Sequence, residues 1–151
     1  MTWSKEFEAG LRDIDCQHRT IVGHVELLEA AQRRREPPEV LAQIAQELVR
    51  FMQYHFDTEE SAMRVYGYEG AEHRSAHLGM VNAVRRRLGE PSLDLSGLRL
   101  FLYNWLTDHV TLEDAKLVAH IAACREPMAE LAKRLEVSAE VLDAVRGSCV
   151  G

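Results

Sequence analysis

Metal-binding side chains recur at helical spacing in four segments of this sequence. His55 and Glu59 are four residues apart, so a helix would place this imidazole and this carboxylate on one face. His73 and His77 repeat the same spacing with two imidazoles. The seven candidate ligands are His18, His55, Glu59, His73, His77, His109 and Asp114. Imidazoles and carboxylates in such a pattern predict a metal centre.

The donor atoms of this set narrow the choice of metal. Nitrogen and oxygen donors without a thiolate suit iron or manganese and disfavour an iron–sulfur cluster. A single tetrahedral zinc ion would leave several of the seven ligands buried and unused. Two six-coordinate ions need about twelve bonds, and five imidazoles, two bridging carboxylates and one solvent-derived oxygen bridge supply about eleven. One position then stays open for a small ligand, provided that both carboxylates bridge.

Helical periodicity dominates the chain, and no stretch shows sustained strand alternation. The apolar pattern predicts four helices over about residues 13–35, 39–66, 71–88 and 94–124. The expected breaks between them are Pro37-Pro38, Gly67 to Gly70, and Gly89 to Ser92. Asp13 or Asp15 can cap the first helix. Residues 1–12 are predicted to form an irregular arm that Trp3 and Phe7 anchor.

The candidate histidines lie on the apolar faces of these helices. An ionisable group in such a position is costly unless it has a partner. A lone histidine there is usually a hydrogen-bonded core residue, but independent core histidines would not line up near the middle of four helices. The two remaining histidines, His24 and His120, fall off the apolar stripes and are expected at the surface.

The fourth predicted helix changes phase after His109. Its apolar stripe comprises Leu98, Leu102, Trp105 and Leu106 before this point, and Leu117, Val118 and Ile121 after it. Residues five apart on a regular helix diverge by about 140°. One wide π-type turn would return His109 and Asp114 to the same face. The alternative is a regular helix that uses Glu113 at the easier four-residue spacing; the phase shift favours Asp114.

Length and charge bound the remaining possibilities. A chain of 151 residues is one domain of ordinary size, and a net charge of −6 argues against a nucleic-acid surface. The basic runs 33–35 and 85–87 stand at predicted helix C-termini, where cations complement the helix dipole. Residues 1–10 lack the apolar run of a signal peptide, so we expect none. No apolar stretch approaches the length of a membrane span.

The cysteines and the end of the chain give two further expectations. Cys16, Cys124 and Cys149 lack metal-ligand spacing, so we expect reduced thiols in a cytoplasmic protein. Pro127 is expected to end the fourth helix, and short helices are predicted over 128–135 and 138–145. The predicted domains are therefore a bundle over 1–125 and a short helical extension over 126–151. The extension would pack on the surface, dock a protein partner or mediate self-association.

These motifs resemble the hemerythrin family, in particular its single-domain bacterial members. The matching pieces are Trp3, Asp15-Cys16-Gln17-His18, His55 to Met63, Gly67-Tyr68 with His73 and His77, and Trp105 to His109 with Asp114. The match covers about residues 3–121. The resemblance implies an all-α fold, an up-down-up-down antiparallel four-helix bundle with an N-terminal arm.

The resemblance also implies a division of the ligands between two iron ions. One iron would take His73, His77 and His109, the other would take His18 and His55 and keep a vacant position, and Glu59 and Asp114 would bridge both together with an oxo or hydroxo group. Such a centre binds dioxygen reversibly for transport, storage or delivery, and the protein would not be an enzyme.

Five apolar residues match the family's oxygen pocket: Ile21, Phe56, Trp105, Leu106 and Val110. An apolar pocket excludes water and substrates, which favours binding over oxidation. One alternative is a sensor of oxygen, nitric oxide or redox state that signals through the C-terminal tail, and another is a di-iron peroxidase or oxidase. Dioxygen is the expected ligand, and neither nucleic acid nor a membrane is expected as a partner.

Overall fold

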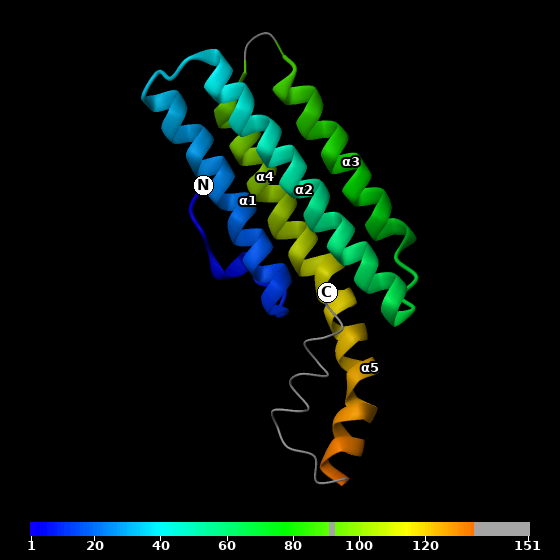
Figure 1. Cartoon of the computed structure of the whole chain (residues 1–151). Coiled ribbons are helices and arrows are strands. Elements are labelled where there is room, and N and C mark those ends of the chain that lie inside the picture. The colour runs from blue at the N-terminus through cyan, green and yellow to red at the C-terminus, as the bar shows by residue number, and fades with distance from the viewer. Residues whose placement is uncertain (91–92, 135–151) are drawn as a thin grey trace.

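The fold is a bundle of four long helices, seen in a computed structural model that describes residues 1–90 and 93–134. The bundle helices are α1 (Arg12–Arg33), α2 (Pro38–Tyr66), α3 (Ala71–Leu88) and α4 (Leu95–His109). The 3-10 turn η1 (Lys5–Phe7) precedes them, and η2 (Val110–Asp114) and α5 (Ala115–Arg134) continue α4. Figure 1 shows that successive bundle helices alternate in direction. The predicted all-α, up-down-up-down four-helix bundle is confirmed.

Local sequence signals explain where α2 begins and ends and where α4 begins. Pro38 opens α2, because its fixed φ suits the first helical position and its missing N–H would have no helical partner there. Gly67 ends α2 with a left-handed φ of 66°, and the Tyr68 N–H then donates to the Met63 carbonyl at 2.8 Å. At the start of α4, Asp94 accepts a hydrogen bond from the Gly97 N–H at 2.9 Å.

The start of α1 differs from the sequence-based expectation. Within the described residues, Leu11 occupies the N-cap position and no side chain caps the helix, so neither Asp13 nor Asp15 plays that part. Asp15 instead turns back to the arm, where its Oδ1 accepts from the N–H groups of Ala9 at 2.6 Å and Gly10 at 3.3 Å. The arm thus competes for the carboxylate that could have capped the helix.

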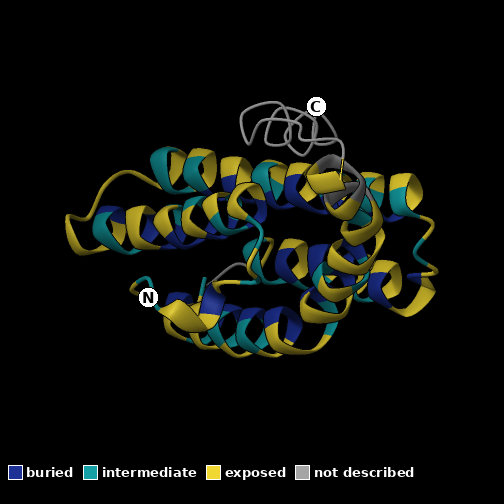
Figure 2. Cartoon of the chain, turned by 90° about the horizontal axis from the view of Figure 1, so that it is seen from below, coloured by how far each residue is buried: buried dark blue, intermediate teal, exposed yellow. Residues whose placement is uncertain are grey.

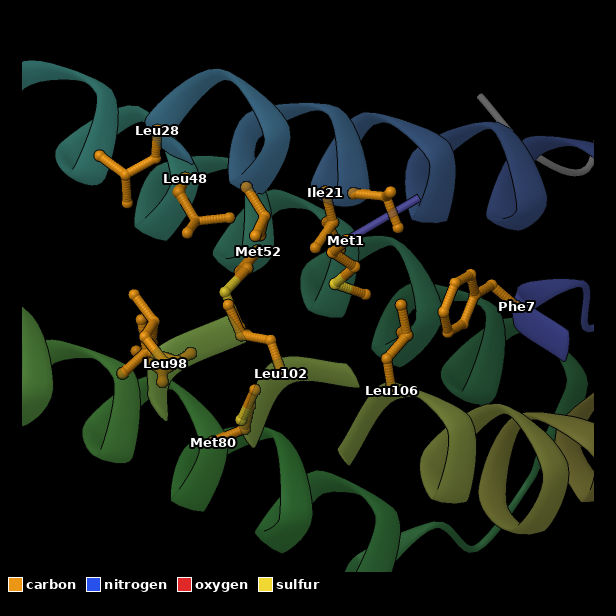
Figure 3. Close-up of a cluster of buried hydrophobic side chains, with 14 of the residues drawn as sticks. Met1, Phe7, Ile21, Leu28, Leu48, Met52, Met80, Leu98, Leu102 and Leu106 are labelled. Atoms are coloured by element: carbon orange, nitrogen blue, oxygen red, sulfur yellow. The ribbon is translucent and has the colours of Figure 1, made fainter. Parts of the chain in front are cut away.

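The N-terminal arm is anchored by its aromatic residues, as predicted. Phe7 is fully buried, and its ring centroid lies 5.7 Å from that of Trp3 and 5.6 Å from that of Tyr103 on α4. Figure 3 shows Phe7 entering the bundle at the end of a row of core side chains. These contacts fix the arm against the part of the bundle that carries His18.

The apolar core fills the space between the helices, and Figure 2 shows their buried faces turned inward. Each helix contributes a stripe of buried residues at helical spacing. Residues drawn in Figure 3 from all four bundle helices are Ile21, Leu28, Leu48, Met52, Met80, Leu98, Leu102 and Leu106. This core lies on one side of the candidate ligands, and a smaller apolar cluster of Met63, Leu117 and Ile121 lies on the other. The expected mid-length position of the ligands is wrong for α1 and α3, where His18, His73 and His77 stand close to the start of the helix.

The expected break at Pro127 is wrong, because α5 runs without interruption from Ala115 to Arg134. A proline inside a helix removes the hydrogen bond to the carbonyl four residues earlier and costs about 3 kcal/mol or more. That carbonyl belongs to Ala123, which is exposed, so water can take the place of the lost donor. Figure 1 shows α5 continuing beyond the end of the bundle formed by α2 and α3.

The described residues test only part of what the sequence predicts for the C-terminal region. The predicted helix over 138–145 and Cys149 lie outside the described residues, and the boundary between residues 125 and 126 stays a prediction. Cys16 and Cys124 are free and exposed within the described part of the chain. Of the helices in residues 1–90 and 93–134, none has an apolar stretch long enough to cross a membrane.

Candidate metal centre

All seven candidate ligands meet inside the bundle, each at most 4% exposed. They come from α1, α2, α3, α4 and η2, and their positions are His18, His55, Glu59, His73, His77, His109 and Asp114. The donor atoms of six of them form two groups, which Asp114 approaches from η2. One group contains Glu59 with His73, His77 and His109, and the other contains Glu59 with His18 and His55. The arrangement predicted from the sequence therefore exists as a spatial cluster.

The imidazoles of the first group converge through their Nε2 atoms. His73 Nε2 and His77 Nε2 each lie 3.0 Å from His109 Nε2. Two ligands at right angles on an ion, with metal–nitrogen bonds of about 2.1 Å, lie about 3.0 Å apart. His109 Nε2 therefore stands from each of the other two nitrogens at the spacing of neighbouring ligands on a six-coordinate ion.

Glu59 divides its two carboxylate oxygens between the groups. Its Oε2 lies 3.0 Å from His77 Nε2, and its Oε1 lies 3.5 Å from His55 Nε2. One helix face carries both His55 and Glu59, because residues four apart on α2 lie above one another. This orientation is what a carboxylate that bridges two ions requires.

Asp114 divides its oxygens in the same way, because η2 is a π-helical turn. Its Oδ1 lies 3.2 Å from His109 Nε2 and 3.1 Å from His73 Nε2, while its Oδ2 lies 3.4 Å from His18 Nε2. The predicted wide turn between His109 and Asp114 is confirmed. It returns the two residues to one face, which a regular helix would not do.

Glu113, the alternative ligand considered from the sequence, points away from the cluster. Its carboxylate accepts a hydrogen bond from Lys116 Nζ at 3.1 Å, in an ion pair open to solvent. The burial of the neighbouring Asp114, which is 0% exposed, shows which of the two side chains the π turn directs inward.

The donor atoms of this cluster are short of hydrogen-bond partners. In the described part of the chain, the buried side-chain atoms without a hydrogen bond are His18 Nε2, His55 Nε2, both oxygens of Glu59, both oxygens of Asp114, and His73 Nδ1. Buried polar groups are nearly always paired, and leaving one unpaired costs about 1–3 kcal/mol. All of these atoms except His73 Nδ1 face the other ligands. Metal ions bound between the ligands would give each of those atoms a partner.

Burial and close charges set the ionisation of the cluster. Burial opposes ionisation of Glu59, but the close imidazoles, His55 first among them, hold the pKa of this carboxyl well below its usual range. Burial lowers the pKa of His55 to about 4. Burial also lowers the pKa of His109, yet the close carboxylates of Asp114 and Glu59 outweigh it and raise the pKa to about 9. A metal ion bound here would compete with protons for these imidazoles.

Two imidazoles are oriented by partners that the sequence analysis did not identify. His18 Nδ1 lies 2.7 Å from the carbonyl of Phe7 in the arm, and His55 Nδ1 lies 3.0 Å from Gln17 Oε1 on α1. Each Nδ1–H donates to an oxygen, which leaves the Nε2 lone pair free to face the cluster. Sequence spacing gives no signal for these partners, because each lies on a different element from its histidine.

A small apolar cavity adjoins the cluster. About 10 Å³ of it is open to a water-sized molecule, which is close to the smallest space that holds one. Its wall includes four of the predicted pocket residues, Ile21, Phe56, Trp105 and Leu106, together with Met1, Met52, Met80 and Leu102. Figure 3 shows Ile21, Met52 and Leu102 directed into the same interior space.

Val110 is the one predicted pocket residue that does not line this cavity in the described structure. It is 2% exposed and belongs to the same core. Val110 stands one helical turn beyond Leu106, directly after His109, so it packs at the level of the ligands instead of along the cavity wall.

Aromatic residues of the cavity wall also hold two of the imidazoles. The Phe56 ring stacks on His77, with centroids 4.0 Å apart and planes 10° from parallel. The Trp105 ring stacks on His109, with centroids 4.2 Å apart and planes 16° from parallel. The wall of the cavity is therefore continuous with the ligands themselves.

The two histidines outside the ligand set are half-buried, so each is only partly exposed at the surface. His24 Nδ1 lies 2.8 Å from the carbonyl of Thr20, and His120 Nε2 lies 2.8 Å from the carbonyl of Tyr66. A backbone partner makes partial burial of an imidazole tolerable. Both stay outside the metal cluster, as expected.

Comparisons with known proteins agree with this geometry. Residues 9–121 match the family model described as the hemerythrin HHE cation binding domain. The chain is 33% identical over 140 residues to the bacteriohemerythrin of Pseudomonas paraeruginosa, and the aligned region covers 88% of this chain and 87% of that protein. It is 29% identical over 129 residues to the bacteriohemerythrin of Stenotrophomonas maltophilia, with 82% of each chain covered.

No solved structure matches the chain with statistical significance. The family model nevertheless spans α1 to α4, η2 and the first part of α5, and so it includes every element that contributes a candidate ligand. On the strength of that match and of the bacterial relatives, this chain belongs to the hemerythrin family, whose domain implies a non-haem di-iron site.

Proposed function

We propose that this protein binds dioxygen reversibly at a non-haem di-iron centre, for oxygen transport, storage or delivery, and that it is a binding protein rather than an enzyme. One observation carries the proposal: two groups of imidazoles share carboxylates that turn one oxygen to each group. Two iron ions bound there would supply the electrons for reversible reduction of dioxygen.

The proposed division of ligands follows the two groups. His73, His77 and His109 would hold one iron, His18 and His55 would hold the other, and Glu59 and Asp114 would bridge both. Three imidazoles would bind the first iron and two would bind the second, so the second iron would have more room for a further ligand. The small ligand would therefore bind on the side of His18 and His55.

The cavity wall supports binding over catalysis. The described side chains of its wall are aliphatic, thioether or aromatic, and none of these side chains is an acid or a base. A reaction that cleaves the oxygen–oxygen bond needs a proton donor at the reacting atoms. By excluding water and offering no such donor, Ile21, Phe56 and Leu106 would keep a bound ligand intact until it leaves.

Metal content and the absorption spectrum test this proposal together. We expect about two irons per purified chain, as two six-coordinate ions need about twelve bonds. A visible band should disappear on deoxygenation and return with oxygen. Two irons without a reversible band would remove reversible oxygen binding while leaving the metal centre. A chain that binds no iron under anaerobic loading would contradict the centre itself.

A second function, sensing of oxygen, nitric oxide or redox state through the C-terminal tail, is favoured by the path of the fourth helix. The proposed ligand Asp114 ends η2, and α5 continues from it without a break to Arg134. Figure 1 shows α5 leaving the bundle. Any movement of Asp114 would therefore be carried directly to the projecting part of α5.

Spin labels can test this coupling. In a chain whose native cysteines are replaced by serine, labels at Glu126→Cys and Glu39→Cys would report the distance between α5 and the start of α2. Sensing predicts that this distance distribution shifts when oxygen is added to the reduced, iron-loaded chain. A control pair within the bundle, Glu39→Cys with Glu69→Cys, should stay constant. An unchanged α5 distance would contradict signalling through the tail.

A further inference from the structure

Glu60 is not one of the candidate ligands, yet its carboxylate contacts His77 on the side that faces away from the cluster. Glu60 Oε1 lies 3.3 Å from His77 Nδ1. His77 is 2% exposed and the Glu60 side chain is 25% exposed, so the contact joins the buried imidazole to the edge of the protein. Because Glu60 can only accept, His77 Nδ1 carries the proton and Nε2 presents its lone pair to the cluster.

Two adjacent carboxylates therefore bracket one imidazole. Glu59 Oε2 lies 3.0 Å from His77 Nε2, while Glu60 lies at the opposite nitrogen. Consecutive residues on a helix point about 100° apart, so α2 can send Glu59 into the centre and Glu60 toward α3. The Phe56 ring, stacked on the same imidazole, fixes its plane.

The second partners of the imidazoles differ in charge. Those of His18 and His55 are neutral oxygens, from a backbone carbonyl and from the Gln17 amide. His77 alone among the ligands has a carboxylate there within the described residues, and His73 Nδ1 has no hydrogen-bond partner in that part of the chain. A carboxylate acceptor makes an imidazole a stronger donor to a metal. The two metal positions are thus electronically unequal.

We infer that Glu60 is a positioning residue for the metal ion held by His73, His77 and His109. It fixes the tautomer and orientation of His77 and strengthens its donation, so that this ion is bound more tightly and its oxidised state is favoured. The inference rests on the proposed di-iron function and assigns a role to a residue outside the ligand set.

Anaerobic titration of the metal-free chain with ferrous ion tests the inference, with the reduction potential of the loaded protein as a second readout. Glu60→Ala should weaken one of the two binding steps by about 10–100-fold, the usual cost of losing an outer partner of a metal-bound histidine. Glu60→Gln keeps an acceptor oxygen but loses the charge. It should retain most of the affinity and raise the reduction potential.

Asp57→Asn is the matched control. Asp57 is an exposed carboxylate on the same helix, and it accepts a hydrogen bond from Gln53 instead of from an imidazole. If Asp57→Asn raises the potential as much as Glu60→Gln, the effect is one of general charge and the inference is wrong. Unchanged ferrous affinity in Glu60→Ala, with two ions still bound by the unmodified chain, would overturn the inference alone. An unmodified chain that binds no iron would overturn the proposed function as well.

Discussion

Replacing Asp114 by alanine removes most of the bound iron, whereas replacing Glu113 by alanine leaves the iron content unchanged. Asp114 is fully buried and its two oxygens face His73 and His18 at 3.1 and 3.4 Å. Its loss would take a bridging ligand from both ions at once. Glu113 forms only a solvent-open pair with Lys116, and such a pair contributes about 0–1 kcal/mol.

Iron per chain after identical loading is the measurement that separates the two residues. Glu59→Ala should behave like Asp114→Ala, because Glu59 also turns one oxygen to each group. Circular dichroism of each variant would show that the bundle has formed. Loss of iron from Glu113→Ala with normal iron in Asp114→Ala would mean that the π turn does not direct Asp114 to the metal.

Iron content in this pair of variants therefore tests the π turn, which the sequence already predicts. The shift of the apolar stripe between Leu106 and Leu117 predicts the extra residue in the turn, and both side chains are buried in the structure. The helices were predictable for a related reason. Burial of one face imposes periodicity along a helix, and proline and glycine mark the places where the chain turns.

Features that depend on contacts between distant segments were not predictable in the same way. Asp15 has the right place to cap α1, but its oxygen bonds the arm at Ala9 and Gly10. Pro127 carries a strong helix-breaking signal, yet the helix continues through it at a position where Ala123 is exposed to solvent. Local sequence propensity gives the tendency of each residue to start or end a helix, but it does not include contacts with other segments or exposure to solvent.

The orientation of the imidazoles shows the same limit more sharply. Spacing along α2 places His55 and Glu59 on one face, but the partner of His55 Nδ1 is Gln17 of another helix. Helix packing alone decides which oxygen reaches that nitrogen. A sequence can therefore predict which residues bind metal ions while leaving open what tunes them.

Removing the iron should lower the melting temperature of the protein by a large margin. In the folded chain without metal, the buried oxygens of Glu59 and Asp114 lack hydrogen bonds in the described structure. The unfolded chain has no assembled set of ligands, so metal binding favours the folded state. At a free iron concentration a thousand times the dissociation constant, one site stabilises the fold by about 4 kcal/mol.

For a chain of this size, that free energy corresponds to a rise in melting temperature of roughly 10 °C per site. Anaerobic thermal unfolding, followed by circular dichroism with and without a chelator, measures the difference. His24→Ala should keep the full stabilisation by metal, because His24 bonds the Thr20 carbonyl and stacks on Phe51 outside the ligand set. His55→Ala should keep about half of it, since the group of Glu59 with three imidazoles remains. Equal melting temperatures for loaded and chelated protein would show that these buried donors are satisfied without metal, and would contradict the centre as the reason for their burial.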